Sequence, residues 1–163
     1  MKTLQVKLPE HSYNVDIGFN ILKRQLPNVV LKKNTDLVVV VTNETLHNLY
    51  PDHISSILKD SGIHVATCVL PDGEKYKNLD TLSQIFDFLM EVSANRKTLI
   101  IAFGGGVIGD MAGFAAATFV RGIPYIQIPT TLLAHVDSSV GGKTAINHPL
   151  GKNTIGAFKQ PEY

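Results

Sequence analysis

The segment Leu99–Asp110 reads LIIAFGGGVIGD, an apolar run followed by a glycine-rich turn. Branched and apolar residues fill Thr98 to Phe103, as expected for a strand buried on both faces of a parallel sheet. The turn Gly104–Gly109 matches the pattern G-x-G-x-x-G, and Gly109 to Phe119 has the composition of a buried helix. A glycine turn between a buried strand and a helix is typical of nucleotide-binding α/β folds.

Strands and helices alternate on both sides of this segment. Apolar runs and helical spacing predict further strands at 37–41, 64–70 and 123–128, and helices at 44–50, 53–59 and from Leu79, behind an Asn78 cap. The alternation predicts right-handed crossovers and a Rossmann-like α/β fold, with a mainly parallel sheet and flanking helices. Residues 3–8 and 13–17, joined through Pro9 and Glu10, predict an opening β-hairpin. From Pro129 onward we expect irregular, glycine-rich backbone.

Composition excludes several classes of protein. The 163 residues are 44% hydrophobic and 18% charged, which is enough for one core without a disulfide or a metal. A net charge of +1 without long runs of like charge argues against a nucleic-acid partner. The apolar stretch Leu99–Val120 contains Asp110 and a glycine cluster, so a strand–turn–helix explains it better than a membrane span. The single cysteine, Cys68, is expected to be a small buried hydrophobe, and a reducing, cytoplasmic location is predicted.

Two groups of residues besides the glycine turn could bind a ligand. The loop Asp72–Lys77 follows a predicted strand, and its carboxylates could accept from ribose hydroxyls while its lysines meet phosphate; the alternative is a solvated charged turn. The Rossmann acidic residue expected about 20 positions after the glycines is missing, because none lies between Asp110 and Asp137. Beyond the next strand, Lys143 and Lys152 are either ligand contacts or ordinary surface charges.

Two further patterns are weaker. Gly142-Lys143-Thr144 resembles the end of a P-loop, but Asp137 stands where the first glycine of that motif is required, so the P-loop interpretation fails. His135 and Asp137 could share a metal or form a hydrogen-bonded structural pair. The glycine turn itself has the alternative of serving only close packing of helix and sheet.

Four blocks taken together resemble the 3-dehydroquinate synthase family: PDGEKYK at 71–77, GGGVIGD at 104–110, PTTLL at 129–133, and DSSVGGKTA at 137–145 leading into GKN at 151–153. The resemblance covers essentially the whole chain but only about the first half of the family's usual length. We therefore expect residues 1–163 to form one NAD-binding α/β domain of a truncated chain, without the family's helical second domain.

The resemblance implies an NAD-dependent lyase of the shikimate pathway of aromatic amino acid biosynthesis, which converts 3-deoxy-D-arabino-heptulosonate 7-phosphate into 3-dehydroquinate and phosphate. It further implies a sugar-phosphate substrate, a homodimer, and a divalent metal, zinc or cobalt, held by a glutamate and two histidines in the second domain. We expect no metal site in this chain and no turnover by it alone. The alternatives are another sugar-phosphate cyclase or polyol dehydrogenase of the same superfamily, or a non-catalytic nucleotide-binding or dimerisation module.

Site residues follow from the resemblance position by position. The implied NAD contacts are Asp72, Gly73, Glu74, Lys75, Tyr76, Lys77, Gly105, Gly106, Val107, Ile108, Gly109, Asp110, Thr130, Thr131, Lys143 and Lys152. The implied catalytic and substrate contacts are Asp137, Lys143, Lys152, Asn153 and Arg121. Arg121 would reach the substrate phosphate of a neighbouring subunit, a role that suits a bidentate guanidinium; its alternative is a helix-terminal cation.

Overall fold

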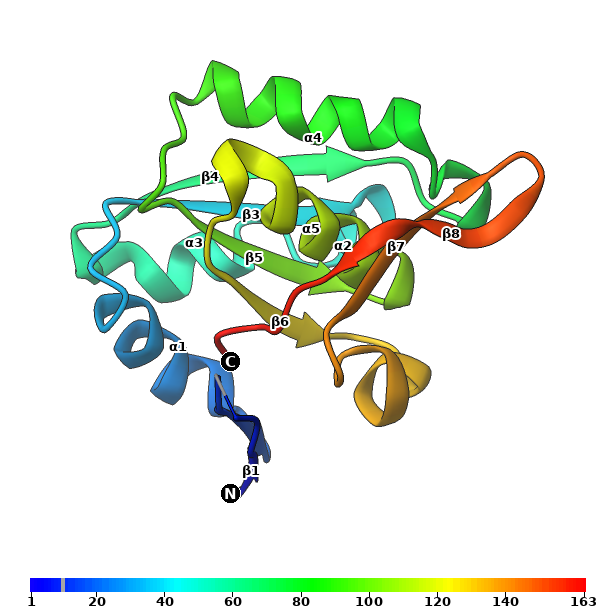
Figure 1. Cartoon of the computed structure of the whole chain (residues 1–163). Coiled ribbons are helices and arrows are strands. Elements are labelled where there is room, and N and C mark those ends of the chain that lie inside the picture. Colours follow the sequence, from blue (N-terminus) through cyan, green and yellow to red (C-terminus); the bar gives the residue numbers. More distant parts are fainter. Residues whose placement is uncertain (10) are drawn as a thin grey trace.

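The computed structural model, which describes residues 1–9 and 11–163, is built around a parallel β-sheet (Figure 1). Four strands in the order β4-β3-β5-β6 make this sheet in the described part of the chain. They are β3 (Leu37–Asn43), β4 (His64–Leu70), β5 (Leu99–Gly104) and β6 (Tyr125–Pro129). All neighbouring pairs are parallel. The predicted α/β fold class is confirmed.

Helices connect the strands and cover both faces of the sheet. α2 (Glu44–Leu49) and α3 (His53–Leu58) lead from β3 to β4, α4 (Leu79–Glu91) leads to β5, and α5 (Gly106–Thr118) leads to β6. In Figure 1, α4 and α5 lie on one face of the sheet, and α3 lies on the other with α1 (Ile21–Leu31), which the sequence analysis did not predict. Short 3-10 turns lie at Lys59–Ser61, Glu74–Tyr76 and Phe119–Arg121, and a π-helical turn lies at Ala134–Ser138.

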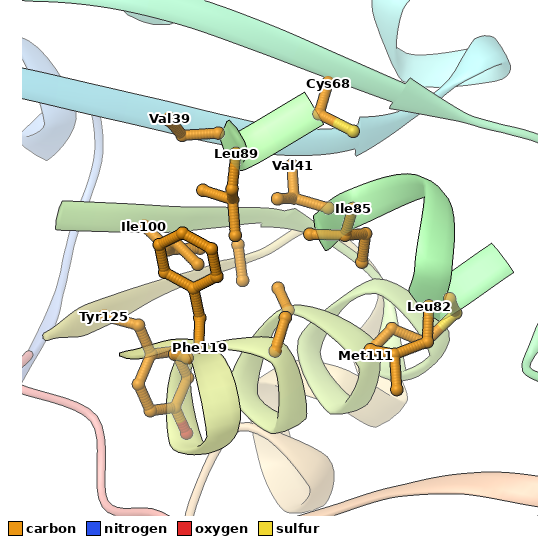
Figure 2. Packing of buried hydrophobic residues seen from close by; sticks show 14 of the residues in the cluster. Val39, Val41, Cys68, Leu82, Ile85, Leu89, Ile100, Met111, Phe119 and Tyr125 are labelled. Atoms are coloured by element: carbon orange, nitrogen blue, oxygen red, sulfur yellow. The ribbon is translucent and has the colours of Figure 1, made fainter. Parts of the chain in front are cut away.

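The core has two parts because successive strand side chains point to opposite faces. Val39 and Val41 of β3 pack with Ile85 and Leu89 of α4 and Met111 of α5 (Figure 2). Val38 and Val40 belong to the cluster on the opposite face, which includes residues of α1 and α3. Burial of each such side chain stabilises the fold by roughly 1.5–3 kcal/mol.

Asparagine side chains cap α2 and α4, whereas no side chain caps α5. The side chains of Asn43 and Asn78 accept hydrogen bonds from the amides of Leu46 (2.9 Å) and Thr81 (3.0 Å). α5 begins after Gly105, and no side chain caps it. The first amides of α5 therefore have neither a helical partner nor a side-chain acceptor.

Two antiparallel hairpins flank the sheet. β1 (Lys2–Val6) and β2 (Tyr13–Ile17) form the predicted opening hairpin, although Glu10 of its connection lies outside the described residues. β7 (Lys143–His148) and β8 (Gly151–Phe158) form a second hairpin, drawn in orange and red beside α5 in Figure 1. The expectation of irregular backbone from Pro129 onward was wrong here. Burial of the alternating residues Thr144 and Ile146 orders β7 despite its glycine- and lysine-rich surroundings.

The last residues run along the edge of β6. The amide of Gln127 donates to the carbonyl of Tyr163 (3.0 Å), and the amide of Glu162 donates to the carbonyl of Tyr125 (2.7 Å). Lys33 of the segment after α1 forms an ion pair with Glu162 (2.5 Å), and the Tyr163 hydroxyl donates to Asp16 of β2. This segment therefore covers a strand edge and ties the first hairpin to the sheet.

The apolar stretch Leu99–Val120 is β5, the glycine turn, α5 and the start of the turn after it. Among the described residues, the helices are too short or too polar for any of them to cross a membrane.

Candidate functional site

A cleft of about 320 Å³ lies at the carboxyl ends of the parallel strands. The chain leaves β3 for β4 on one side and returns to β5 on the other, so the strand order reverses between β3 and β5. Ligands of open α/β sheets bind outside such a reversal. The cleft brings together eight of the predicted residues, from three separate segments of the chain: Asp72, Gly73, Gly105, Gly106, Val107, Ile108, Thr130 and Thr131.

Glycines in the turn allow close approach rather than unusual backbone angles. Gly104, Gly105 and Gly106 do not have positive φ. A Cβ at Gly105 would lie 3.0 Å from Cγ2 of Thr131, and one at Gly106 would lie 3.0 Å from Oγ of Ser138. The missing side chains thus let two segments close around the uncapped start of α5, where unpaired amides and the helix dipole favour an anion.

The Ser138 hydroxyl is buried and has no hydrogen-bond partner. Ser138 belongs to the π-helical turn that follows β6, and its hydroxyl lies beside Gly106 of α5. Buried polar groups are normally paired, so an orphaned hydroxyl next to a glycine turn fits a site completed by a ligand. The sequence analysis did not single out Ser138, because a serine in a polar run carries no distinguishing pattern.

Asp72 is held by two side chains, one from the end of β3 and one from the start of α2. Its Oδ1 accepts from Nδ2 of Asn43 (2.8 Å), and its Oδ2 accepts from the hydroxyl of Thr45 (2.7 Å). Each carboxylate oxygen keeps further acceptor capacity, and the side chain is exposed at the cleft. Asn43 and Thr45 also line the cleft and were not predicted. The available signal was their position at the carboxyl end of a buried strand.

The residues that follow Asp72 in the loop have contacts of their own. Gly73 has φ 122°, which only glycine adopts readily. Glu74 accepts from Nδ2 of Asn147 in β7 (2.8 Å). The ammonium of Lys75 lies 4.8 Å from the centre of the Tyr76 ring, and the Lys75 side chain is exposed.

Lys77, Asp110 and Asn153 meet in a separate polar cluster. The ammonium of Lys77, which is 5% exposed, donates to the carboxylate of Asp110 and to Oδ1 of Asn153 (2.5 Å). Burial raises the pKa of Asp110, the Lys77 ammonium opposes that rise, and the charge of Glu74 adds to it. The structure places these three predicted residues together, one from each of the loop, α5 and β8.

Other predicted residues lie farther apart. Lys143 and Lys152 are exposed toward opposite ends of the second hairpin, since Lys143 pairs with Phe158 whereas Gly151, next to Lys152, pairs with His148. Asp137 is exposed on the π-helical turn. The remaining predicted turn residue, Gly109, is buried within α5, where a Cβ would lie 2.7 Å from Oε1 of Gln127.

Arg121 is not brought to the cleft. It is exposed just after α5, and the 13 residues of that helix separate it from the glycine turn by roughly 20 Å. Its backbone is strained, because Val120 (φ 42°) and Arg121 (φ 71°) both have left-handed angles that β-branched and long side chains rarely adopt. Within this chain, Arg121 therefore takes no part in the cleft.

No three histidine, cysteine, aspartate or glutamate side chains in the described part of the chain are placed to hold a metal ion. His135 and Asp137 are both exposed on the π-helical turn. Cys68 is buried, as predicted, and burial raises the pKa of its thiol to about 12.

The family model of the 3-dehydroquinate synthase N-terminal region matches residues 67–163, more than half of the chain. The chain belongs to the 3-dehydroquinate synthase family. Its sequence is 56% identical over 162 residues to the 3-dehydroquinate synthases of Acinetobacter baylyi (strain ATCC 33305 / BD413 / ADP1) and Neisseria gonorrhoeae (strain NCCP11945). The match covers 99% of this chain but 44% and 45% of those relatives, so the chain spans less than half of their length.

Solved structures place this 3-dehydroquinate synthase family member among sugar-phosphate cyclases. A 2-deoxy-scyllo-inosose synthase complexed with carbaglucose-6-phosphate, NAD+ and Co2+ is 28% identical with a TM-score of 0.90, over 98% of this chain and 44% of that one. A 2-epi-5-epi-valiolone synthase from Streptomyces hygroscopicus with NAD+ and Zn2+ bound is 28% identical with a TM-score of 0.82, over 96% of this chain and 43% of that one. An iron-containing alcohol dehydrogenase from Thermotoga maritima, 18% identical with a TM-score of 0.70 over 88% of this chain and 42% of that one, shares the fold.

Proposed function

We propose that this chain is the NAD-binding domain of a 3-dehydroquinate synthase, which converts 3-deoxy-D-arabino-heptulosonate 7-phosphate into 3-dehydroquinate and phosphate. The observation that carries the cofactor part is the cleft that joins Asp72 to the uncapped start of α5, with the orphaned Ser138 hydroxyl buried beside Gly106. The reaction part is supported by the 56% identity to 3-dehydroquinate synthases.

The residues of the cleft suit the parts of NAD. Asp72 would accept hydrogen bonds from ribose hydroxyls, replacing the acidic residue that is missing downstream of the glycines. The amides at the start of α5 and the Ser138 hydroxyl would donate to the pyrophosphate, which the glycines let approach the backbone. Thr130 and Thr131 would close the other wall of the cleft. When bound, NAD supplies the hydride acceptor.

Substrate and metal sites extend beyond the cleft. We propose that Asp137, Lys143, Lys152 and Asn153 contact the sugar phosphate, and that Arg121 serves the substrate of a neighbouring subunit in a homodimer. The strained backbone at Val120 and Arg121 supports a special role for that position. A divalent metal would be held by residues that this sequence does not include, so the chain alone would not turn over.

Cofactor binding is tested by titrating NAD+ into the chain in a calorimeter. Loss of the charged hydrogen bonds in Asp72→Ala should weaken binding about tenfold or more, because such bonds contribute roughly 1.5–3 kcal/mol. Asp60→Ala is the matched control, since Asp60 is exposed in a turn away from the cleft. Absence of binding by the unaltered chain, or equal losses in both variants, would contradict the cofactor site.

Another sugar-phosphate cyclase is the second candidate, favoured by the TM-score of 0.90 to the 2-deoxy-scyllo-inosose synthase. A polypeptide that joins this chain to the remaining length of its relatives should release phosphate from the heptulosonate phosphate. Release of phosphate from a hexose 6-phosphate instead would favour the second candidate. The 163-residue chain, assayed alongside, should release phosphate from neither.

A further inference from the structure

Lys77 lies in the loop after β4. Among the described residues, its side chain alone joins this loop to both α5, through Asp110, and the second hairpin, through Asn153. Its backbone also takes part, because the Lys77 carbonyl accepts from the amide of Asn147 in β7 (2.8 Å). Both the main chain and the side chain of one residue thus hold the hairpin against the loop.

The Lys77 ammonium already donates hydrogen bonds to groups of the protein itself. It is the donor to both Asp110 and Asn153, and its side chain is 6% exposed. Moving it toward a phosphate would leave the largely buried Asp110 carboxylate, 18% exposed, without its cation, which is unfavourable. Lys75, two residues earlier, is exposed and has no such commitment among the described contacts.

Asn153 is held by two hydrogen bonds in an unusual backbone conformation. It has a left-handed φ of 54°, which asparagine tolerates better than most residues. Its amide donates to Oδ1 of Asn147 (2.8 Å), and its side chain accepts from Lys77. Asn147 in turn donates to Glu74 (2.8 Å). A continuous polar chain therefore runs from the loop through the tip of the hairpin to α5, directly beside Lys152.

We propose that Lys77 is a positioning residue, which sets the second hairpin and Asp110 relative to the glycine turn and does not itself contact a phosphate. Its effect on ligands is carried by Asp110, Asn153 and the neighbouring Lys152. The part of this inference that concerns the cofactor rests on the proposed function; the part that concerns the hairpin does not.

The first test is made on the ligand-free chain. Hydrogen exchange of the amides in β7 and β8 should accelerate about tenfold or more in Lys77→Met, because the bridge that holds the hairpin is lost. Adding Asn153→Gly should change little further, since both substitutions remove the Lys77–Asn153 contact and glycine tolerates the left-handed φ at position 153. Lys75→Met is the matched control and should exchange as the unaltered chain does. Unchanged exchange in Lys77→Met, or fully additive effects, would overturn the proposal.

Lys77→Met leaves the charge of Asp110 buried and could prevent folding. The double variant Lys77→Met/Asp110→Asn removes both charges, so it should fold and its hydrogen exchange can be measured. Its hairpin should still exchange about tenfold faster than in the unaltered chain, because Asn153 still lacks its donor. Hairpin exchange equal to that of the unaltered chain would overturn the proposal.

The second test separates positioning from phosphate contact by titrating NAD+ at two salt concentrations. Lys77→Met/Asp110→Asn should lower affinity about tenfold with an unchanged salt dependence, since no charge that faces the phosphates is lost. Lys77→Arg should recover part of the affinity. A reduced salt dependence in the double variant would show a phosphate contact and overturn the proposal. Failure of the unaltered chain to bind NAD+ would refute the proposed function, while hydrogen exchange would still decide the role of Lys77.

Discussion

Thr144 of β7 packs so tightly against Gly113 of α5 that a Cβ at position 113 would clash with the threonine Cγ2. The ring of Tyr125 lies on another side of the same glycine, 3.2 Å from the position of that Cβ. Gly113 is therefore the point at which the second hairpin and the sheet both close on α5. This contact orients the strand that begins with Lys143.

Gly113→Ala should lower the free energy of unfolding by about 1–3 kcal/mol, because the added methyl group overpacks a buried site. Intrinsic helix propensity predicts the opposite sign, a gain of about 1 kcal/mol. Urea unfolding of the variant distinguishes the two. Ala117→Gly, near the end of the same helix, is the comparison for helix propensity and should cost about 1 kcal/mol or less. Stabilisation by Gly113→Ala would show that the hairpin does not pack on α5 as described.

Ser138→Ala should weaken NAD+ binding about threefold to tenfold, the loss expected for one neutral hydrogen bond. The same change should leave the free energy of unfolding equal or slightly higher, because the hydroxyl has no partner in the ligand-free protein. Calorimetric titration and urea unfolding give the two values. Ser139→Ala is the control, and a similar loss of affinity there would deny Ser138 a specific contact.

The thiol of Cys68 should resist alkylation in the folded chain at pH 8. Burial raises its pKa to about 12, so both access and the thiolate fraction are low. Iodoacetamide labelling should become fast only when urea unfolds the chain. The neighbouring side chain of Val69 is 37% exposed, so Val69→Cys in a Cys68→Ala background should label rapidly without urea. Rapid labelling of Cys68 in the folded chain would contradict its place in the core.

Stability should fall in alkali partly through Tyr125. Burial raises the pKa of this fully buried tyrosine to about 12, although a hydrogen bond with Gln127 opposes the rise. Between pH 10 and 12 the unfolded chain releases the phenolic proton while the folded chain retains it, so the free energy of unfolding decreases as the pH rises. Tyr125→Phe should make the decrease shallower in urea unfolding at several pH values. Tyr50→Phe is the control, and an equally shallow profile there would contradict the assignment.

The sequence determined the central sheet, the helices that connect its strands and most of the cleft. β-branched runs such as Leu37–Val41, the Asn78 cap and the glycine turn are local signals, and each acts through nearest neighbours along the chain. Because carboxyl ends of parallel strands meet at one edge, the placement of Asp72 near Gly105 and Thr130 followed from the pattern as well.

Only the tertiary structure decided which side chains touch. The hairpin β7–β8 was missed because its order comes from burying Thr144 and Ile146 against elements distant in the chain. Lys77 donates hydrogen bonds to Asp110 and Asn153, and Asp72 accepts them from Asn43 and Thr45. These bonds join residues that are 27 to 76 positions apart in the sequence. Propensity and periodicity describe neighbours within a few residues, whereas burial and hydrogen bonding across the fold determine whether a lysine meets a ligand or a carboxylate.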